Sequence, residues 1–325
     1  MILGGLARWL PGLIAALLLP LEAPAQTDAA ARQWLQRIYS ATQKLSYSGT
    51  FVYHYDDQVE TSRITRIVDA SGPIEKLEAL DGVPREIIRR GDEVVCYLPA
   101  SMTMKVDKLS GRKVFPAILP DQLNELSDYY VIRRGGVERV AGFPSQIVIL
   151  TPKDGMRYGR KLWADVHTGM LLRAKTFNER NEVMESFTFT DLQIGGHIER
   201  ERVRSQFAGK GKDWHVENSG AAEANLAQAG WTLRAQPPGF RKITEMTRTL
   251  GGKAGVGHMV LSDGLAAMSV FIQVASSASS PPGLSRQGAI NVYSRDLGGH
   301  RITVVGEAPA ESVKFIANAI ERRTQ

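Results

Sequence analysis

Residues 47–55 read YSGTFVYHY, and this stretch decides the fold class. Aromatic side chains stand at alternate positions, so they point to one face of an extended chain. They are Tyr47, Phe51, Tyr53 and Tyr55. Two aspartates follow as a turn, and a second alternating stretch returns over residues 59–68. The pattern predicts an antiparallel β-hairpin with one covered face.

The same alternation continues along the chain. Further short strands, separated by Gly, Asp and Pro turns, are expected at 74–80, 85–90, 94–98, 102–108, 129–133, 137–140, 145–151, 157–165, 171–178 and 183–192. Before the hairpin, apolar residues at helical spacing from Trp34 to Leu45 predict a helix, capped by Thr27 and Asp28. A second short helix is expected at 115–126. Together these elements predict a large, strongly curved antiparallel sheet with helices on one side, in an α+β fold.

The composition changes after Ile194, where glycine-rich segments without apolar periodicity indicate a linker. A short helix is expected at 221–229, and residues 276–283 are expected to form a loop. Strands are expected at 231–234, 242–248, 257–262, 268–274, 288–296 and 300–306. A closing helix begins at Pro309. The predicted domains are 26–195 and 221–325, joined by a linker at 196–220.

Residues 1–25 have the layout of a cleavable signal peptide. Arg8 precedes an apolar run over residues 10–21, and Ala23-Pro24-Ala25 forms an A-x-A cleavage site. The run is shorter than the ~20 apolar residues that a membrane span requires. We therefore expect export, with cleavage after Ala25.

The single cysteine, Cys96, lies in the apolar stretch 94–98 and cannot form an internal disulfide. A small buried hydrophobic side chain is the favoured interpretation, and a reactive thiol is the alternative. Of the 325 residues, 43% are hydrophobic and 23% are charged, which excludes a disordered chain. The net charge of +6 is too small to indicate nucleic-acid binding. Residues 26–196 carry a net +1 and residues 197–325 a net +5, so the surplus lies in the linker and the small domain.

Catalytic and cofactor motifs are absent from the sequence. It contains no H-E-x-x-H, no G-x-S-x-G, no P-loop and no dinucleotide-binding G-x-G-x-x-G. The six histidines are scattered without metal-ligand spacing. Asp165 and Asp263 lie in sequences typical of Asx turns. We therefore expect neither an enzyme nor a metal or cofactor protein, although an enzyme acting on an envelope polymer remains a weaker alternative.

Several segments resemble the RseB/MucB family, in the same order along nearly the whole mature chain. In the first unit they are 45–53 (LSYSGTFVY), 138–142, 157–173 (RYGRKLWADVHTGMLLR) and 186–191. In the second unit they are 237–240 (PPGF) and 262–272 (SDGLAAMSVFI). The W-x-D-x-x-T-G turn is also similar to periplasmic lipoprotein carriers, so the second-unit segments are the more specific ones.

The resemblance implies a periplasmic negative regulator of the envelope-stress sigma factor. Such proteins bind the periplasmic part of a RseA/MucA-like membrane anti-sigma factor and protect it from regulated proteolysis, and lipopolysaccharide or its lipid A part is thought to release them. The implied fold is a large half-open β-barrel with helices on its concave side, followed by a small α+β domain. A periplasmic lipid or lipoprotein carrier is the alternative, and homo-oligomerisation stays open.

Three expectations about sites follow. An apolar groove for acyl chains is expected on one sheet face, lined by Trp34, Phe51, Tyr53, Tyr55 and Tyr97 together with Val95. Partner binding is expected on a basic face of the small domain, through Phe240, Arg241, Lys242, Phe271, Arg286, Arg295 and Arg301. The Gly-rich stretch at 208–212 is expected to let the domains reorient and to be cleaved first by proteases.

Overall fold

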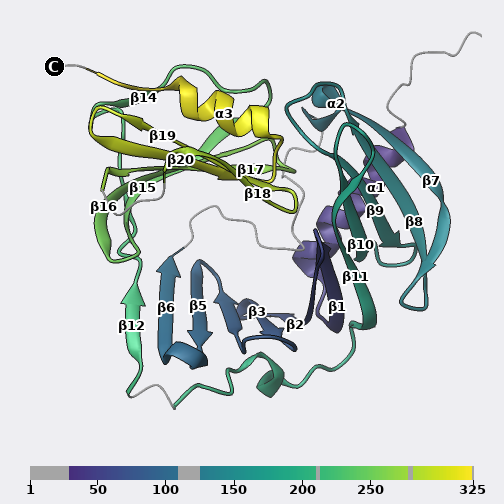
Figure 1. Cartoon of the computed structure of the whole chain (residues 1–325). Helices are drawn as coiled ribbons and strands as arrows, with labels where there is room; N and C mark the ends of the chain where they lie inside the picture. Colours follow the sequence, from purple (N-terminus) through teal and green to yellow (C-terminus); the bar gives the residue numbers. More distant parts are fainter. Residues whose placement is uncertain (1–28, 109–124, 210–212, 277–280, 324–325) are drawn as a thin grey trace, which may run out of the picture.

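A computed structural model describes residues 29–108, 125–209, 213–276 and 281–323 (Figure 1). The expected signal peptide, the Thr27–Asp28 cap and nearly all of the helix expected at 115–126 lie outside these residues. Strands build two sheets, and the two domains lie against each other. The mostly-sheet α+β architecture with a large first domain and a small second domain is therefore confirmed.

The large sheet has twelve strands among the described residues, in the order β12-β6-β5-β4-β3-β2-β1-β11-β10-β9-β8-β7. Neighbouring strands in this sheet run antiparallel, except that β12 and β6 are parallel. The bounds are β1 (Tyr47–Tyr55), β2 (Gln58–Asp69), β3 (Gly72–Ala79), β4 (Glu86–Arg90), β5 (Glu93–Leu98), β6 (Thr103–Lys108), β7 (Tyr130–Val140), β8 (Phe143–Pro152), β9 (Gly159–Asp165), β10 (Leu171–Phe177), β11 (Val183–Ile194) and β12 (His215–Asn218). Because β7 and β12 are not paired with each other, this sheet is curved but not closed.

Helix α1 (Ala29–Lys44) covers the inner face of this sheet (Figure 1). Leu35 and Ile38 are buried there with Tyr47 and Phe51 of β1, as the periodicities of both segments predict. Phe51 lies edge-on to Phe189 of β11, with ring centroids 5.8 Å apart. The aromatic hairpin quoted first thus supplies the centre of the large core. Helix α2 (Leu126–Tyr129) is short and precedes β7.

The segment after β11 runs along the opposite face of the sheet instead of hanging free. It includes the 3₁₀ turn η3 (Arg200–Val203), while a further 3₁₀ turn, η1 (Pro99–Ser101), joins β5 to β6. Ile198 and Val203 are buried against Ile67 and Ile74, and the Ser205 hydroxyl donates to Glu86. Strand β12 then pairs with the edge strand β6. The predicted linker is therefore anchored on the large domain wherever it is described.

The second domain contains a seven-stranded sheet in the order β13-β15-β16-β17-β20-β19-β18, with a separate pair β14 and β21. Its elements are β13 (Ala222–Glu223), β14 (Trp231–Leu233), β15 (Arg241–Leu250), β16 (Lys253–Ser262), β17 (Ala267–Val274), β18 (Gly283–Gln287), β19 (Ile290–Leu297), β20 (His300–Gly306), α3 (Ala310–Ala319) and β21 (Ile320–Arg322). Helix α3 packs Val313, Ile316 and Ala317 into the core of this domain.

Two sequence predictions about elements are wrong, and one strand was missed. Residues 221–229 form β13 and turns instead of a helix, because Asn225 caps a turn through its side chain. The strand expected at 288–296 is present as β19, but its hairpin partner β18 was not expected, since Gly288 turns the chain between the two strands. The strands expected at 129–133 and 137–140 are one strand, β7, with an irregularity between Arg134 and Val137.

Candidate interaction surfaces

The two domains are joined by a buried ion pair between Arg157 and Asp263. Arg157 lies two residues before β9, and Asp263 lies in the turn between β16 and β17. The Asp263 Oδ1 atom accepts from the backbone N–H groups of Leu265 and Ala266, which is the Asx role expected from the sequence. Its Oδ2 atom accepts from Arg157 Nη1 and from the Tyr130 hydroxyl, both at 3.0 Å. Both charged side chains are fully buried.

Aromatic rings surround this guanidinium. Its central carbon lies 4.7 Å from the ring centroid of Tyr129, 5.5 Å from Tyr130 and 5.2 Å from Phe240. Burial, together with the neighbouring Asp263 carboxylate, raises the pKa of Tyr130. Arg157 Nε also pairs with the partly exposed Asp154 at 3.0 Å, so removing Asp263 leaves the guanidinium one weaker partner. Removing Arg157 would leave the buried Asp263 carboxylate without its cation, which is the costly way to break such a pair.

Further contacts extend the interface at both ends of the small domain. Arg160 of β9 pairs with Glu307 at 3.0 Å, and the Tyr158 hydroxyl accepts from Asn291 at 2.9 Å. At the other end, Asp107 of β6 accepts from the Ser219 hydroxyl at 2.6 Å and pairs with Arg248. The domains are thus docked through several contacts along their interface, in contrast to the loose arrangement that the linker composition suggested. Residues 210–212, within the stretch expected to be cleaved, lie outside the described residues.

The residues predicted to bind a partner do not form one basic face. Arg295 donates to the carbonyls of Ala317 and Ile320 at the end of α3, and Arg301 pairs with Asp296. These two arginines therefore stabilise the small domain itself.

The remaining predicted partner residues have varied roles. Arg241 pairs with Glu125 at 2.7 Å and Arg286 with Asp56 at 3.6 Å, so both contact the large domain. Lys242 pairs with Glu245 at 2.8 Å. The two aromatic candidates are engaged as well. Phe240 is buried beside Arg157, and Phe271 stacks on His258 with centroids 4.4 Å apart.

The residues predicted to line a lipid groove divide between the two faces of the large sheet. Phe51 belongs to the buried core, and Trp34 and Tyr53 pack against it. Tyr55 is on the same face by alternation, with its hydroxyl donating to Glu60 at 2.7 Å.

Tyr97 and Val95 are on the opposite face, so the expectation of one shared face is wrong for them. Tyr97 pairs across the sheet with Glu86, then Glu78, Arg63 and Thr50, and directly paired residues share a face. Thr50 is next to Phe51 in β1, so their side chains point to opposite faces of the sheet. The register across five strands, which the sequence alone does not fix, decides this.

The same register identifies apolar residues that the sequence reasoning missed. Leu77, Ile87 and Cys96 are directly paired on β3, β4 and β5, in a row that continues to Ile64 of the inner face. All three are half-buried. Burial raises the pKa of the Cys96 thiol. This row extends the apolar inner face of the sheet from the buried core at Ile64 to the half-buried Cys96 on β5.

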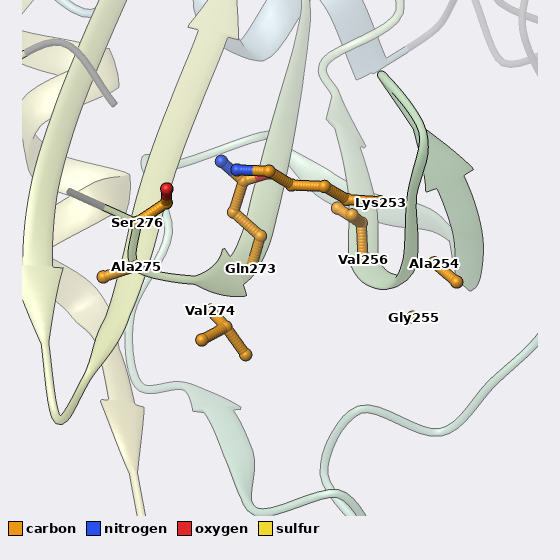
Figure 2. A pocket seen from close by; sticks show the side chains of 8 residues that line it. All are labelled: Lys253, Ala254, Gly255, Val256, Gln273, Val274, Ala275 and Ser276. Carbon is orange, nitrogen blue, oxygen red and sulfur yellow. The ribbon is translucent and has the colours of Figure 1, made fainter. Parts of the chain in front are cut away.

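A separate pocket of about 260 Å³ lies at the ends of β16 and β17 (Figure 2). Lys253, Val256, Gln273 and Val274 are among the residues that line it. None of the residues predicted from sequence contributes to it. The described part of the chain shows no group of His, Cys, Asp or Glu side chains that could hold a metal, and none of its helices is long and apolar enough to cross a membrane.

The comparisons with known proteins match this two-domain arrangement. The MucB/RseB N-terminal domain model matches residues 30–207, and the MucB/RseB C-terminal domain model matches residues 225–321. The sigma factor AlgU regulatory protein MucB of Pseudomonas aeruginosa is 31% identical over 303 residues, covering 91% of this chain and 92% of that protein. The sigma-E factor regulatory protein RseB of Escherichia coli K12 is 25% identical over 315 residues, covering 92% and 93%.

Solved structures agree over both domains. A chain of the Pseudomonas aeruginosa MucA/MucB complex superposes with a TM-score of 0.72 at 29% identity, covering 91% of this chain and 100% of that chain. A crystal structure of MucB in complex with MucA(peri) gives a TM-score of 0.69 at 28% identity, with the same coverage. These relatives are named as regulatory proteins, not as enzymes. With both domain models matched in order along most of its length, the chain belongs to the MucB/RseB family.

Proposed function

We propose that this chain is a periplasmic regulator that binds the periplasmic part of a MucA/RseA-like membrane anti-sigma factor and so restrains the envelope-stress sigma factor. The observation that carries the proposal is the likeness to MucB in its complexes with MucA, at 28–29% identity over 91% of the chain. The signal-peptide layout of residues 1–25 supports export to the periplasm. The second domain distinguishes this regulator from a simple carrier, which needs only the large domain.

The regulatory effect follows if the bound chain covers the site at which the anti-sigma factor is first cut. The test is digestion of the anti-sigma periplasmic domain by the first protease of the cascade, with and without the mature chain 26–325. Strong slowing of cleavage is expected. Equal cleavage rates in both reactions contradict protection.

Release by lipopolysaccharide or lipid A is the second part of the proposal. Support comes from the half-buried row of Leu77, Ile87 and Cys96, which offers acyl chains an apolar surface on the inner face of β3 to β5. Phe51 and Tyr53 border the closed core next to this surface.

Cys96 provides a direct test, because it is the only cysteine of the chain. Bound acyl chains are expected to slow alkylation of its thiol by iodoacetamide and to lower the affinity for the anti-sigma domain. Delipidated polysaccharide is the matched control and is expected to do neither. Alkylation at the same rate with and without lipid A contradicts this location of the lipid site.

For the partner surface we retain Arg241, Lys242 and Arg286, whose side chains are 61%, 47% and 53% exposed in their ion pairs. Exposed ion pairs are weak, so a partner's carboxylates can replace the present ones at little cost. A carrier function would instead show as extraction of lipoprotein from inner membranes by the purified chain, which we do not expect.

A further inference from the structure

Four cationic side chains gather on the outer face of the large sheet, opposite α1. Arg133 pairs with Ile149, Ile149 with Lys161, and Lys161 with Lys175, so three of the cations lie in one row across β7 to β10. Arg173 is one alternation further along β10. The residues between them, such as Leu162 and Ala174, are buried in the core on the other face.

The Trp163 ring lies beneath three of these cations. Its indole is 2% exposed, and its Nε1 donates to Glu138 Oε2 at 2.7 Å. The Lys161 ammonium lies 4.7 Å from the ring centroid, the Arg173 guanidinium 5.3 Å and the Lys175 ammonium 5.9 Å. The charged ends of these three side chains therefore lie over the ring, and all three side chains stay partly exposed to water. We call Arg133, Lys161, Arg173 and Lys175 around this indole the Trp163 patch.

The charge of the Trp163 patch is not neutralised by the described residues. None of the four cations forms an ion pair with a described carboxylate; Arg173 donates instead to the Thr188 hydroxyl at 3.2 Å. Glu138 accepts a hydrogen bond from the indole. A domain that is close to neutral overall thus concentrates positive charge on one face.

We propose that the Trp163 patch is an electrostatic docking surface for an anionic phospholipid membrane. The cations form a two-dimensional array on strands about 4.8 Å apart, with Lys161 and Lys175 on neighbouring strands and Ile149 between Lys161 and Arg133. Such an array matches a field of phosphate groups better than a single peptide chain. A protein partner would also need an apolar anchor, whereas the aromatic ring at the centre is buried. Adsorption of lysines and arginines to anionic lipid needs no such anchor.

The proposal does not rest on the anti-sigma-factor proposal, and the two can fail separately. The experiment is co-sedimentation of the mature chain with phosphatidylcholine vesicles that contain or lack phosphatidylglycerol. The wild type is expected to bind only the anionic vesicles and to dissociate as salt is raised. In Lys161→Gln/Arg173→Gln/Lys175→Gln, the partition coefficient is expected to fall on the order of 100-fold, roughly fivefold for each charge.

The matched control is Lys44→Gln/Arg90→Gln/Lys253→Gln, which removes the same charge from exposed positions elsewhere. It is expected to bind like the wild type. Lys161→Arg/Lys175→Arg keeps the charge and is expected to retain binding, which separates charge from folding. Wild-type binding that is equal with both vesicle types, or an equal loss in control and patch variants, overturns the proposal. So does a patch variant that binds vesicles normally, or one whose only defect is towards the anti-sigma domain in solution.

Discussion

At the scale of single residues, Arg157 and Asp263 decide how the two domains meet. Two fully buried, oppositely charged side chains in one interface cost desolvation that only close pairing offsets. Here the pairing is supplemented by the Tyr130 hydroxyl and by three aromatic rings. The pair therefore determines how the two domains are oriented, more than it adds to the free energy of their docking.

Asp263→Asn keeps an oxygen for the turn but removes the charge that Arg157 faces. We expect it to lower the free energy of unfolding by about 1–3 kcal/mol, because the buried Arg157 guanidinium then keeps only the partly exposed Asp154 as a charged partner. Urea unfolding measures this. Glu311→Gln, which breaks the exposed pair with Lys314, is the matched control and is expected to have little effect. If Asp263→Asn loses as little unfolding free energy as the control, the ion pair between Arg157 and Asp263 is not buried in solution.

A second residue, Glu75, makes stability depend on pH. Burial raises the pKa of its carboxyl above the ordinary 4.5, and Arg66 and Arg89 offset this only in part. The folded chain therefore binds this proton more tightly than the unfolded chain. The contribution is fully present below about pH 4.5 and is lost as the pH rises through the folded pKa.

Glu75→Gln imitates the protonated form and removes this dependence. We expect the free energy of unfolding of the variant to rise relative to wild type as the pH goes from 4 to 7, measured by urea titration. Glu93→Gln, at an exposed position, is the matched control. If the difference in unfolding free energy between Glu75→Gln and wild type stays constant from pH 4 to 7, the pKa of the Glu75 carboxyl is not raised by burial.

At the scale of elements, alternation in the sequence predicts strands that have one covered face. The hairpin strand at 47–55 and the strand at 300–306 end where the sequence predicts. The polar edge strands β12 and β18 carry no such signal, because their side chains are exposed on both faces. Cross-strand register cannot be predicted from the sequence either. It places Tyr97 on the face opposite the predicted groove.

Close packing of β1 against β11 is testable at Gly49. A β-carbon there would lie 2.5 Å from the Asp191 carbonyl oxygen and 2.7 Å from Leu192 Cδ1. Gly49→Ala is therefore expected to cost about 1–3 kcal/mol of unfolding free energy by overpacking. Gly136→Ala in β7 adds a methyl group where no atom lies within 4 Å and is the matched control. Equal stability of the two variants contradicts the tight pairing.

At the scale of the whole molecule, two docked domains replace the loosely linked pair that composition suggests. The Asp263 turn was predicted from its sequence, but its buried partner Arg157 lies 106 residues away and no local pattern connects them. The basic surplus after residue 196 was likewise real in the sequence. The sequence could not show which of these basic residues are available to a partner. Arg295 and Arg301 form their contacts within their own domain. Family resemblance, not physical pattern, indicated the partner.

The central claim is that the docked chain binds an anti-sigma factor. Isothermal titration of the mature chain 26–325 with the periplasmic domain of a MucA/RseA-like protein tests it most directly. We predict saturable binding that Arg241→Glu/Lys242→Glu/Arg286→Glu weakens, mainly through slower association. Glu substitutions at the exposed residues Lys44, Arg90 and Lys253 serve as the matched control and are expected to leave binding unchanged. The absence of any heat of binding by the correctly folded wild-type chain would contradict the account.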